Sequence, residues 1–144
     1  MHMSIEFGRK LSLAYSAMCR PLCQELKLPQ TAFDILMFLA NNPSYKTARD
    51  IVEVRNIKAN LVSVNVDKLV REGYLAREAV EGDRRKTELL CTEKAAPVIG
   101  KGRALQEKFA EHLLLGLDEA QREAFAQSVA AMEKNLDEIL KGEE

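Results

Sequence analysis

The sequence predicts a mainly α-helical protein with one small β-hairpin. Apolar residues recur at helical spacing over most of the 144 positions, and only the stretch from Tyr74 to Cys91 resembles two strands around a turn. With 47% apolar and 30% charged residues, the composition is that of a folded globular protein. No apolar run approaches the roughly 18 residues that a membrane-spanning helix needs, which excludes a transmembrane role.

Spacing and prolines predict the first two helices. Over about Ile5 to Leu26, four apolar residues at 4-3-4 spacing share one helical face, namely Leu11, Tyr15, Met18 and Leu22. Pro21 lies inside this pattern, and we expect it to bend or interrupt the helix. The next helix opens at Leu28-Pro29, where a proline in the first turn loses no hydrogen bond, and it stops at Asn41-Asn42-Pro43.

Two short helices joined by a tight break come next. Thr47 can cap the first, with Asp50 close to its positive end, and a polar break at Arg55-Asn56 ends it. The second spans about Lys58 to Glu72, and Gly73 fits the left-handed position after a helix. Its expected core face consists of Leu61 or Val62, Val66, Leu69 and Val70. Tandem helices with so tight a break are typical of a helix-turn-helix.

A hairpin follows the helix-turn-helix. Its strands are expected over Tyr74–Val80 and Lys86–Cys91, around a turn at Glu81-Gly82-Asp83. This places three basic residues near the tip, Arg84, Arg85 and Lys86. Residues 55–86 carry a net charge of +3, whereas residues 103–144 carry −5, which suits a protein that presents its central part to a polyanion.

The chain ends in two predicted helices. Thr92 can cap a helix that runs to about Leu115, although Pro97 and two glycines weaken its first turns. Leu117 and Asp118 begin the last helix, which ends near Leu140. Its apolar residues repeat at 4-3-4-3, the pattern of a helix that packs on a partner helix: Phe125, Val129, Met132, Leu136 and Ile139.

Helices, a recognition-type helix and a hairpin in this order form a winged helix-turn-helix. Three segments resemble motifs of the MarR family of bacterial transcription regulators: residues 28–36 (LPQTAFDIL), residues 66–75 (VDKLVREGYL), and the wing signature Asp83-Arg84-Arg85 with Leu90-Cys91-Thr92. The resemblance implies an N-terminal dimerisation helix in residues 1–27, a DNA-binding lobe in residues 28–95 and C-terminal dimerisation helices in residues 96–144. It also implies a regulator rather than an enzyme, and no catalytic constellation is recognisable.

The candidate DNA-binding residues lie on the reading helix and the wing. An α-helix fits the major groove, and outward side chains on its N-terminal part reach base edges. Those side chains are Lys58, Asn60, Ser63, Val64 and Lys68. On the wing, Arg84, Arg85 and Lys86 are expected to reach the minor groove or the backbone, with Asp83 holding Arg85 in place. The alternative is that these residues form an ordinary solvent-exposed helix face and hairpin tip with no role in DNA binding. Lys58, Val64 and Asn65 depart from the family pattern.

The apolar faces of the terminal helices exceed what a small winged helix can bury, which predicts an intertwined homodimer on a near-palindromic operator in double-stranded DNA. The resemblance further implies a repressor that a small aromatic effector releases from DNA. Effector-binding residues in the implied pocket include Tyr15, Phe33 and Met37.

Two alternatives remain open from the sequence. Winged helices also serve as protein-docking modules, and Cys19 and Cys23, which share one helix face, suggest a thiol-based redox sensor. Core packing explains these cysteines more simply, and Cys91 is expected to be buried. The odd number of cysteines argues against disulfides and for the cytoplasm. We expect no cofactor, and no metal because His2 and His112 lack companions at ligand spacing.

Overall fold

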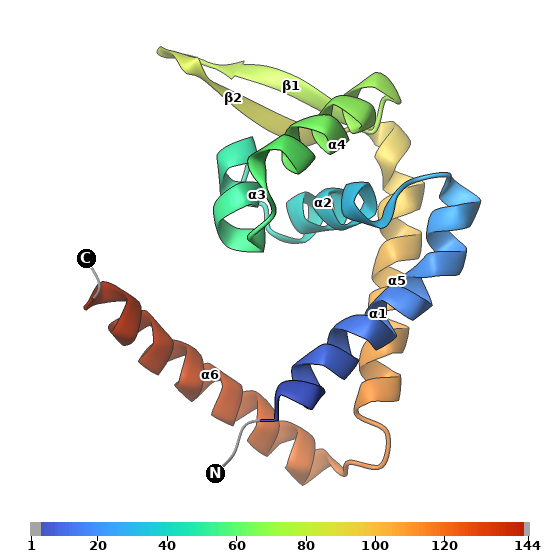
Figure 1. Ribbon diagram of the computed structural model, residues 1–144, viewed down its shortest axis with the longest axis vertical. Coiled ribbons are helices and arrows are strands. Elements are labelled where there is room, and N and C mark those ends of the chain that lie inside the picture. The colour runs from blue at the N-terminus through green and yellow to red at the C-terminus, as the bar shows by residue number, and fades with distance from the viewer. Residues whose placement is uncertain (1–3, 143–144) are drawn as a thin grey trace. The chain divides into compact units, whose positions relative to one another are not determined.

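A computed structural model describes residues 4–142 and confirms the predicted fold class (Figure 1). The elements follow in the order α1 (Ile5–Leu26), α2 (Gln30–Asn41), α3 (Ala48–Arg55), α4 (Ala59–Arg71), β1 (Leu75–Val80), β2 (Asp83–Cys91), a 3-10 turn (Glu93–Ala95), α5 (Ala96–Leu113) and α6 (Glu119–Lys141). The chain divides into two compact units, one up to Phe109 and one from Ala110, and each is described by itself. No helix in the described residues is long and apolar enough to cross a membrane.

Side-chain caps and left-handed residues set the helix boundaries as expected. The Thr47 hydroxyl accepts a hydrogen bond from the Asp50 amide at 3.1 Å, and the Asp50 carboxylate accepts one from the Thr47 amide at 3.1 Å, which completes a capping box at α3. Asn56 and Gly73 have positive φ angles, of 53° and 86°, where α3 and α4 end. The predicted helix-turn-helix is therefore present in α3 and α4.

Two expectations about the helix boundaries differ from the structure. Pro21 is expected to bend or interrupt α1, and the helix is not interrupted there: it runs continuously from Ile5 to Leu26, with Cys19 and Cys23 on either side of Pro21 buried against the lobe. Thr92 makes no side-chain cap, since its hydroxyl donates instead to the Gly73 carbonyl oxygen at 2.5 Å. This bond joins the end of the hairpin to the end of α4.

The hairpin has a shorter turn than the sequence predicts. β2 begins at Asp83 rather than Lys86, and the turn consists of Glu81 and Gly82, whose φ of 86° suits glycine. The strands are antiparallel, with an irregularity at Ala79 and Val80, and Glu78 lies directly opposite Glu88. At the base the Leu89 amide donates to the Lys46 carbonyl oxygen at 2.7 Å, which fastens the hairpin to the segment before α3.

The core is built around α2. Its residues Phe33, Ile35, Leu36 and Met37 are at most 2% exposed, and they pack in one cluster with buried side chains of α1, α3, α4, β1, β2 and α5. Gly102 allows α5 to approach closely: a Cβ atom there would lie 2.4 Å from the Met37 sulfur and 3.1 Å from a Phe33 ring carbon. At Gly100, on the same helix, a Cβ atom would have nothing within 4 Å.

Gly102→Ala should therefore destabilise the protein, and Gly100→Ala should not. The added methyl at residue 102 must push two fully buried side chains, which costs about 1–3 kcal/mol of the free energy of unfolding. At residue 100 the alanine gains helix propensity, roughly 0.5–1 kcal/mol. Urea unfolding followed by circular dichroism measures both. Equal effects of the two substitutions would contradict the close approach of α5 to α2.

Candidate nucleic-acid interface

The outer face of α4 presents the predicted reading side chains. Asn60, Ser63 and Val64 are exposed, and Val64 retains 65% of its accessible surface. The opposite face, with Val62, Val66 and Leu69, is buried, which fixes the rotation of the helix. An exposed polar face on the second helix of a helix-turn-helix is the surface that enters the major groove in proteins of this design.

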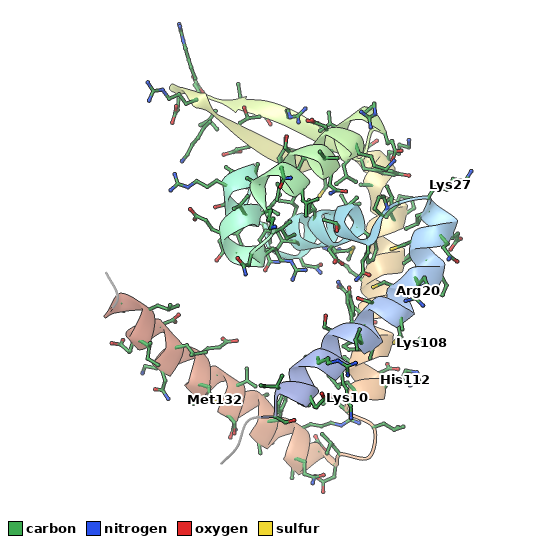
Figure 2. The ribbon with its side chains drawn as sticks, viewed as in Figure 1. Lys10, Arg20, Lys27, Lys108, His112 and Met132 are labelled. Carbon is green, nitrogen blue, oxygen red and sulfur yellow. The ribbon has the colours of Figure 1, made fainter. Side chains whose placement is uncertain are left out.

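Two basic residues at the ends of this face behave differently from each other. Lys58 is exposed at the N-cap of α4 and makes no side-chain cap. Lys68 is partly buried, and its Nζ lies 2.9 Å from Glu72 Oε1 on the same helix. It also lines a cavity with Arg20 of α1 and Lys27, the residue after α1, whereas Asn60 and Ser63 do not line this cavity. Figure 2 labels Arg20 on α1 and Lys27 at the end of that helix.

Asn65 shows how α4 accepts a polar residue in the core. Its side chain is 7% exposed, and its Nδ2 donates to the Leu61 carbonyl oxygen at 2.8 Å. A buried amide that is satisfied within its own helix carries little energetic penalty. Asn65 therefore belongs to the structure of the helix and takes no place on the reading face.

At the wing, Asp83 orients the backbone. The expectation that its carboxylate holds the Arg85 guanidinium is wrong: Asp83 Oδ1 accepts a hydrogen bond from the Arg85 backbone amide at 3.0 Å. In residues 4–142, no ion pair involves Arg84, Arg85 or Lys86, and all three are exposed. The hairpin tip therefore has a fixed backbone and unpaired cationic side chains.

The start of α3 adds positive charge that the sequence did not indicate. A cleft of about 410 Å³ lies between Thr47–Arg49 and Arg85–Thr87, so Arg49 and the wing cations line one depression. Arg49 is bonded to Glu53, with 2.8 Å between its Nε and the carboxylate oxygen. Helical spacing alone places Arg49 on α3, but only the fold brings it beside the wing.

The hairpin and α4 also meet through a charged pair. The Arg77 guanidinium of β1 is bonded to the Asp67 carboxylate of α4. Beneath this pair, α3, α4 and the hairpin enclose a largely apolar cavity of about 520 Å³ that includes Val52, Val62 and Leu89. Asp67 and Arg71 share the outer side of α4 with Asn60 and Val64 by helical spacing, and both are exposed.

Another cavity lies beside α2, on the side of α1 and α5. It measures about 300 Å³, and Tyr15 and Met37 line it with Asp34, Phe38, Asn41, Asn42, Arg55, Gln106 and Phe109. Phe33 is fully buried and does not line it.

Two ionisable groups of this cavity have shifted pKa values. Burial raises the pKa of Tyr15 to about 12, and its hydroxyl oxygen accepts a hydrogen bond from Gln106 Nε2 at 3.1 Å. Burial also raises the pKa of the Asp34 carboxyl, against the lowering effect of Arg55.

Comparison with known proteins agrees with this geometry. A sequence model of the MarR family matches residues 26–86, which include the helix-turn-helix and most of the hairpin. The transcriptional regulator PA3341 is 25% identical, with 92% of this chain and 97% of that chain covered and a TM-score of 0.78. A MarR-family regulator from Listeria monocytogenes, solved with a 26mer DNA, is 17% identical, with coverages of 94% and 90% and a TM-score of 0.81.

Over residues 26–86 the chain matches the MarR family, and its fold is that of solved MarR-family regulators. It is similar also to BpsR of Bordetella bronchiseptica, at 20% identity, coverages of 92% and 96% and a TM-score of 0.67. The DNA binding of BpsR is regulated by 6-hydroxynicotinic acid. Members of the MarR family are transcription regulators, not enzymes.

The three thiols of the chain differ in exposure. Cys19 and Cys23 are buried, and burial raises the pKa of both, that of Cys23 to about 11. The expectation that Cys91 is buried is wrong: it is exposed, because it is the last residue of β2 and lies at the edge of the core. Since the thiolate is the reactive form, the two buried thiols are poor redox sensors. No metal-binding cluster is found in residues 4–142, and His2 lies outside them.

Labelling with a disulfide reagent should distinguish these thiols. At pH 8 we expect one thiol per native chain, Cys91, to react first, and two to react only after unfolding. Burial raises the pKa of all three thiols, so the difference comes from access, because Cys91 is exposed and Cys19 and Cys23 are buried. Absorbance of the released thiolate measures the count. Cys91→Ser should abolish the fast phase, and a fast phase that persists in this variant would show that Cys19 or Cys23 is reactive.

Proposed function

We propose that this transcription regulator acts as a homodimer that binds a near-palindromic operator in double-stranded DNA. The observation that carries the proposal is the shared placement of an exposed α4 face and an unpaired cationic wing in one lobe. In this proposal Asn60, Ser63 and Val64 read the major groove, Lys58 contacts a base or phosphate, and Arg84, Arg85 and Lys86 reach the minor groove or backbone. The DNA-bound Listeria relative supports it.

The unit from Ala110 supports the dimer. None of the α6 residues is buried in the single chain. Its apolar side is exposed, with Phe125, Met132, Leu136, Ile139 and Leu140 each at least 46% accessible. Figure 2 labels Met132 on this helix. An exposed apolar stripe of this length is typical of a helix that packs on a partner, and a second copy of the chain supplies one.

We infer that a small aromatic molecule in the cavity beside α2 releases the protein from DNA, and that the protein is a repressor in the cytoplasm. The cavity contains Tyr15 and Met37, and it also contains Arg55, the last residue of α3. A ligand there would act on the helix that leads into α4. The similarity to BpsR, whose DNA binding an aromatic acid regulates, supports this part of the proposal.

A protein-docking module is the competing function, and the salt dependence of the binding affinity distinguishes it from DNA binding. Binding through phosphates releases counterions, so the affinity falls steeply as salt rises, whereas a docking surface for protein shows no such slope. The redox alternative is disfavoured by the buried, high-pKa thiols of Cys19 and Cys23.

Arg85→Ala should weaken DNA binding and flatten its salt dependence. Duplexes selected from a random library provide the operator, and fluorescence anisotropy over a range of salt gives the slope of log K against log salt. The slope should fall by about 0.9 for each phosphate that the variant no longer neutralises. Arg9→Ala is the matched control, because Arg9 is an exposed α1 arginine paired with Glu6. An unchanged slope in Arg85→Ala would remove the wing from the interface.

Leu136→Glu should dissociate the dimer and thereby weaken operator binding. A charge buried without a partner in an apolar interface costs several kcal/mol, so the dimer dissociation constant should rise on the order of 100-fold. Analytical ultracentrifugation measures it. Gln127→Glu adds the same charge on the other side of α6 and should leave the dimer intact. A wild-type protein that sediments as a monomer would refute the proposed dimer.

A further inference from the structure

Asp34 and Arg55 form an ion pair without a hydrogen bond between them in the cavity beside α2. Arg55 Nη2 lies 3.9 Å from Asp34 Oδ2, beyond hydrogen-bond distance. The Asp34 side chain is 18% exposed and the Arg55 side chain 45% exposed. Both residues line the cavity. An acceptor and a donor thus lie side by side, and each has hydrogen-bonding capacity left for a ligand.

The walls of the same cavity suit a flat ring. Tyr15, Phe38 and Phe109 all line it. The Tyr15 and Phe109 rings meet edge to face with 5.2 Å between centroids, and Phe38 is stacked on Tyr45, so all three rings are held by aromatic neighbours. A volume of about 300 Å³ accommodates one or two fused aromatic rings. The aromatic walls therefore determine the flat shape of the ligand, and the Asp34–Arg55 pair determines which polar groups its edge must carry.

We propose that the cavity binds a planar aromatic lactam, a ring with an N–H and a C=O next to each other. The N–H donates to the Asp34 carboxylate, and the carbonyl oxygen accepts from the Arg55 guanidinium. This inference rests on the proposed function and names the chemical class of its effector. A simple aromatic carboxylate matches Arg55 but brings a second negative charge to Asp34, so the pair disfavours it relative to a neutral lactam.

The position of the pair gives the ligand a route to the DNA-reading helix. Asp34 is on α2, the buried centre of the lobe, and Arg55 is the last residue of α3. Asn56 follows with a left-handed backbone, and α4 begins three residues later. A ligand that bridges Asp34 and Arg55 adds a polar link between the end of α3 and α2, which in the free protein are joined by the core packing of Ile51 and by this long ion pair.

Two probes that differ by one methyl group test the proposal. By isothermal titration to the purified protein, 2-quinolone should bind about 10- to 100-fold more tightly than N-methyl-2-quinolone, which has the same rings and carbonyl but no N–H. 2-Naphthoate serves as the aromatic acid and should bind more weakly than 2-quinolone. Equal binding of the two quinolones, or tighter binding of 2-naphthoate, would overturn the proposal.

Variants assign the preference to the named residues. Asp34→Leu, similar in size, should reduce the ratio between the two quinolones to about one, and Arg55→Gln should weaken 2-quinolone about tenfold. Arg9→Gln, at an exposed α1 arginine outside the cavity, should change neither. A ratio that persists in Asp34→Leu contradicts the assignment. DNA binding that 2-naphthoate but not 2-quinolone releases would refute the lactam and leave the proposed function standing, whereas a protein that binds no duplex refutes the proposed function itself.

Discussion

The burial of α2 is the constraint on which the rest of the structure depends. Phe33, Ile35, Leu36 and Met37 point in different directions around the helix, and each is almost completely removed from solvent. A helix that buries residues on several sides needs partners on each of them. α1, α4 and β2 contact it directly, and α5 reaches it through the gap left by Gly102. The orientation of α4, and so of its outward side chains, follows from packing on this helix.

The sequence predicted the helices closely where local chemistry decides their ends. α1 occupies Ile5–Leu26 as expected, α3 begins at the Thr47 capping box, and α4 ends before Gly73. These boundaries depend on side chains within a few residues of each other. The role of Thr92 was not predictable in this way, because its hydroxyl partner, the Gly73 carbonyl, is distant in sequence and is brought close only by the folded hairpin.

The candidate site also contains some residues whose position the sequence predicts and others that only the fold brings together. The exposed position of Asn60, Ser63 and Val64 follows from helical spacing alone. The Asp34–Arg55 pair and the approach of Arg49 to the wing join residues of different elements, and periodicity carries no information about such contacts. Helical spacing places Lys68 next to the outward face of α4. Its Nζ is nevertheless paired with the Glu72 carboxylate, so its position on the helix alone does not make it a DNA contact.

The two opposed carboxylates of the hairpin, Glu78 and Glu88, have a consequence for how the protein behaves in a crowded cell. Like charges directly across a strand pair weaken the ribbon by a few tenths of a kcal/mol, up to about 1 kcal/mol. The ribbon has only two strands, so its outer edges carry backbone groups that another extended chain could join, apart from the Leu89 amide, which is bonded to the Lys46 carbonyl oxygen. Charged side chains disfavour such pairing, and both strands of the ribbon carry them. The charges of the wing thus weaken the strand pair slightly and protect it against edge-to-edge aggregation.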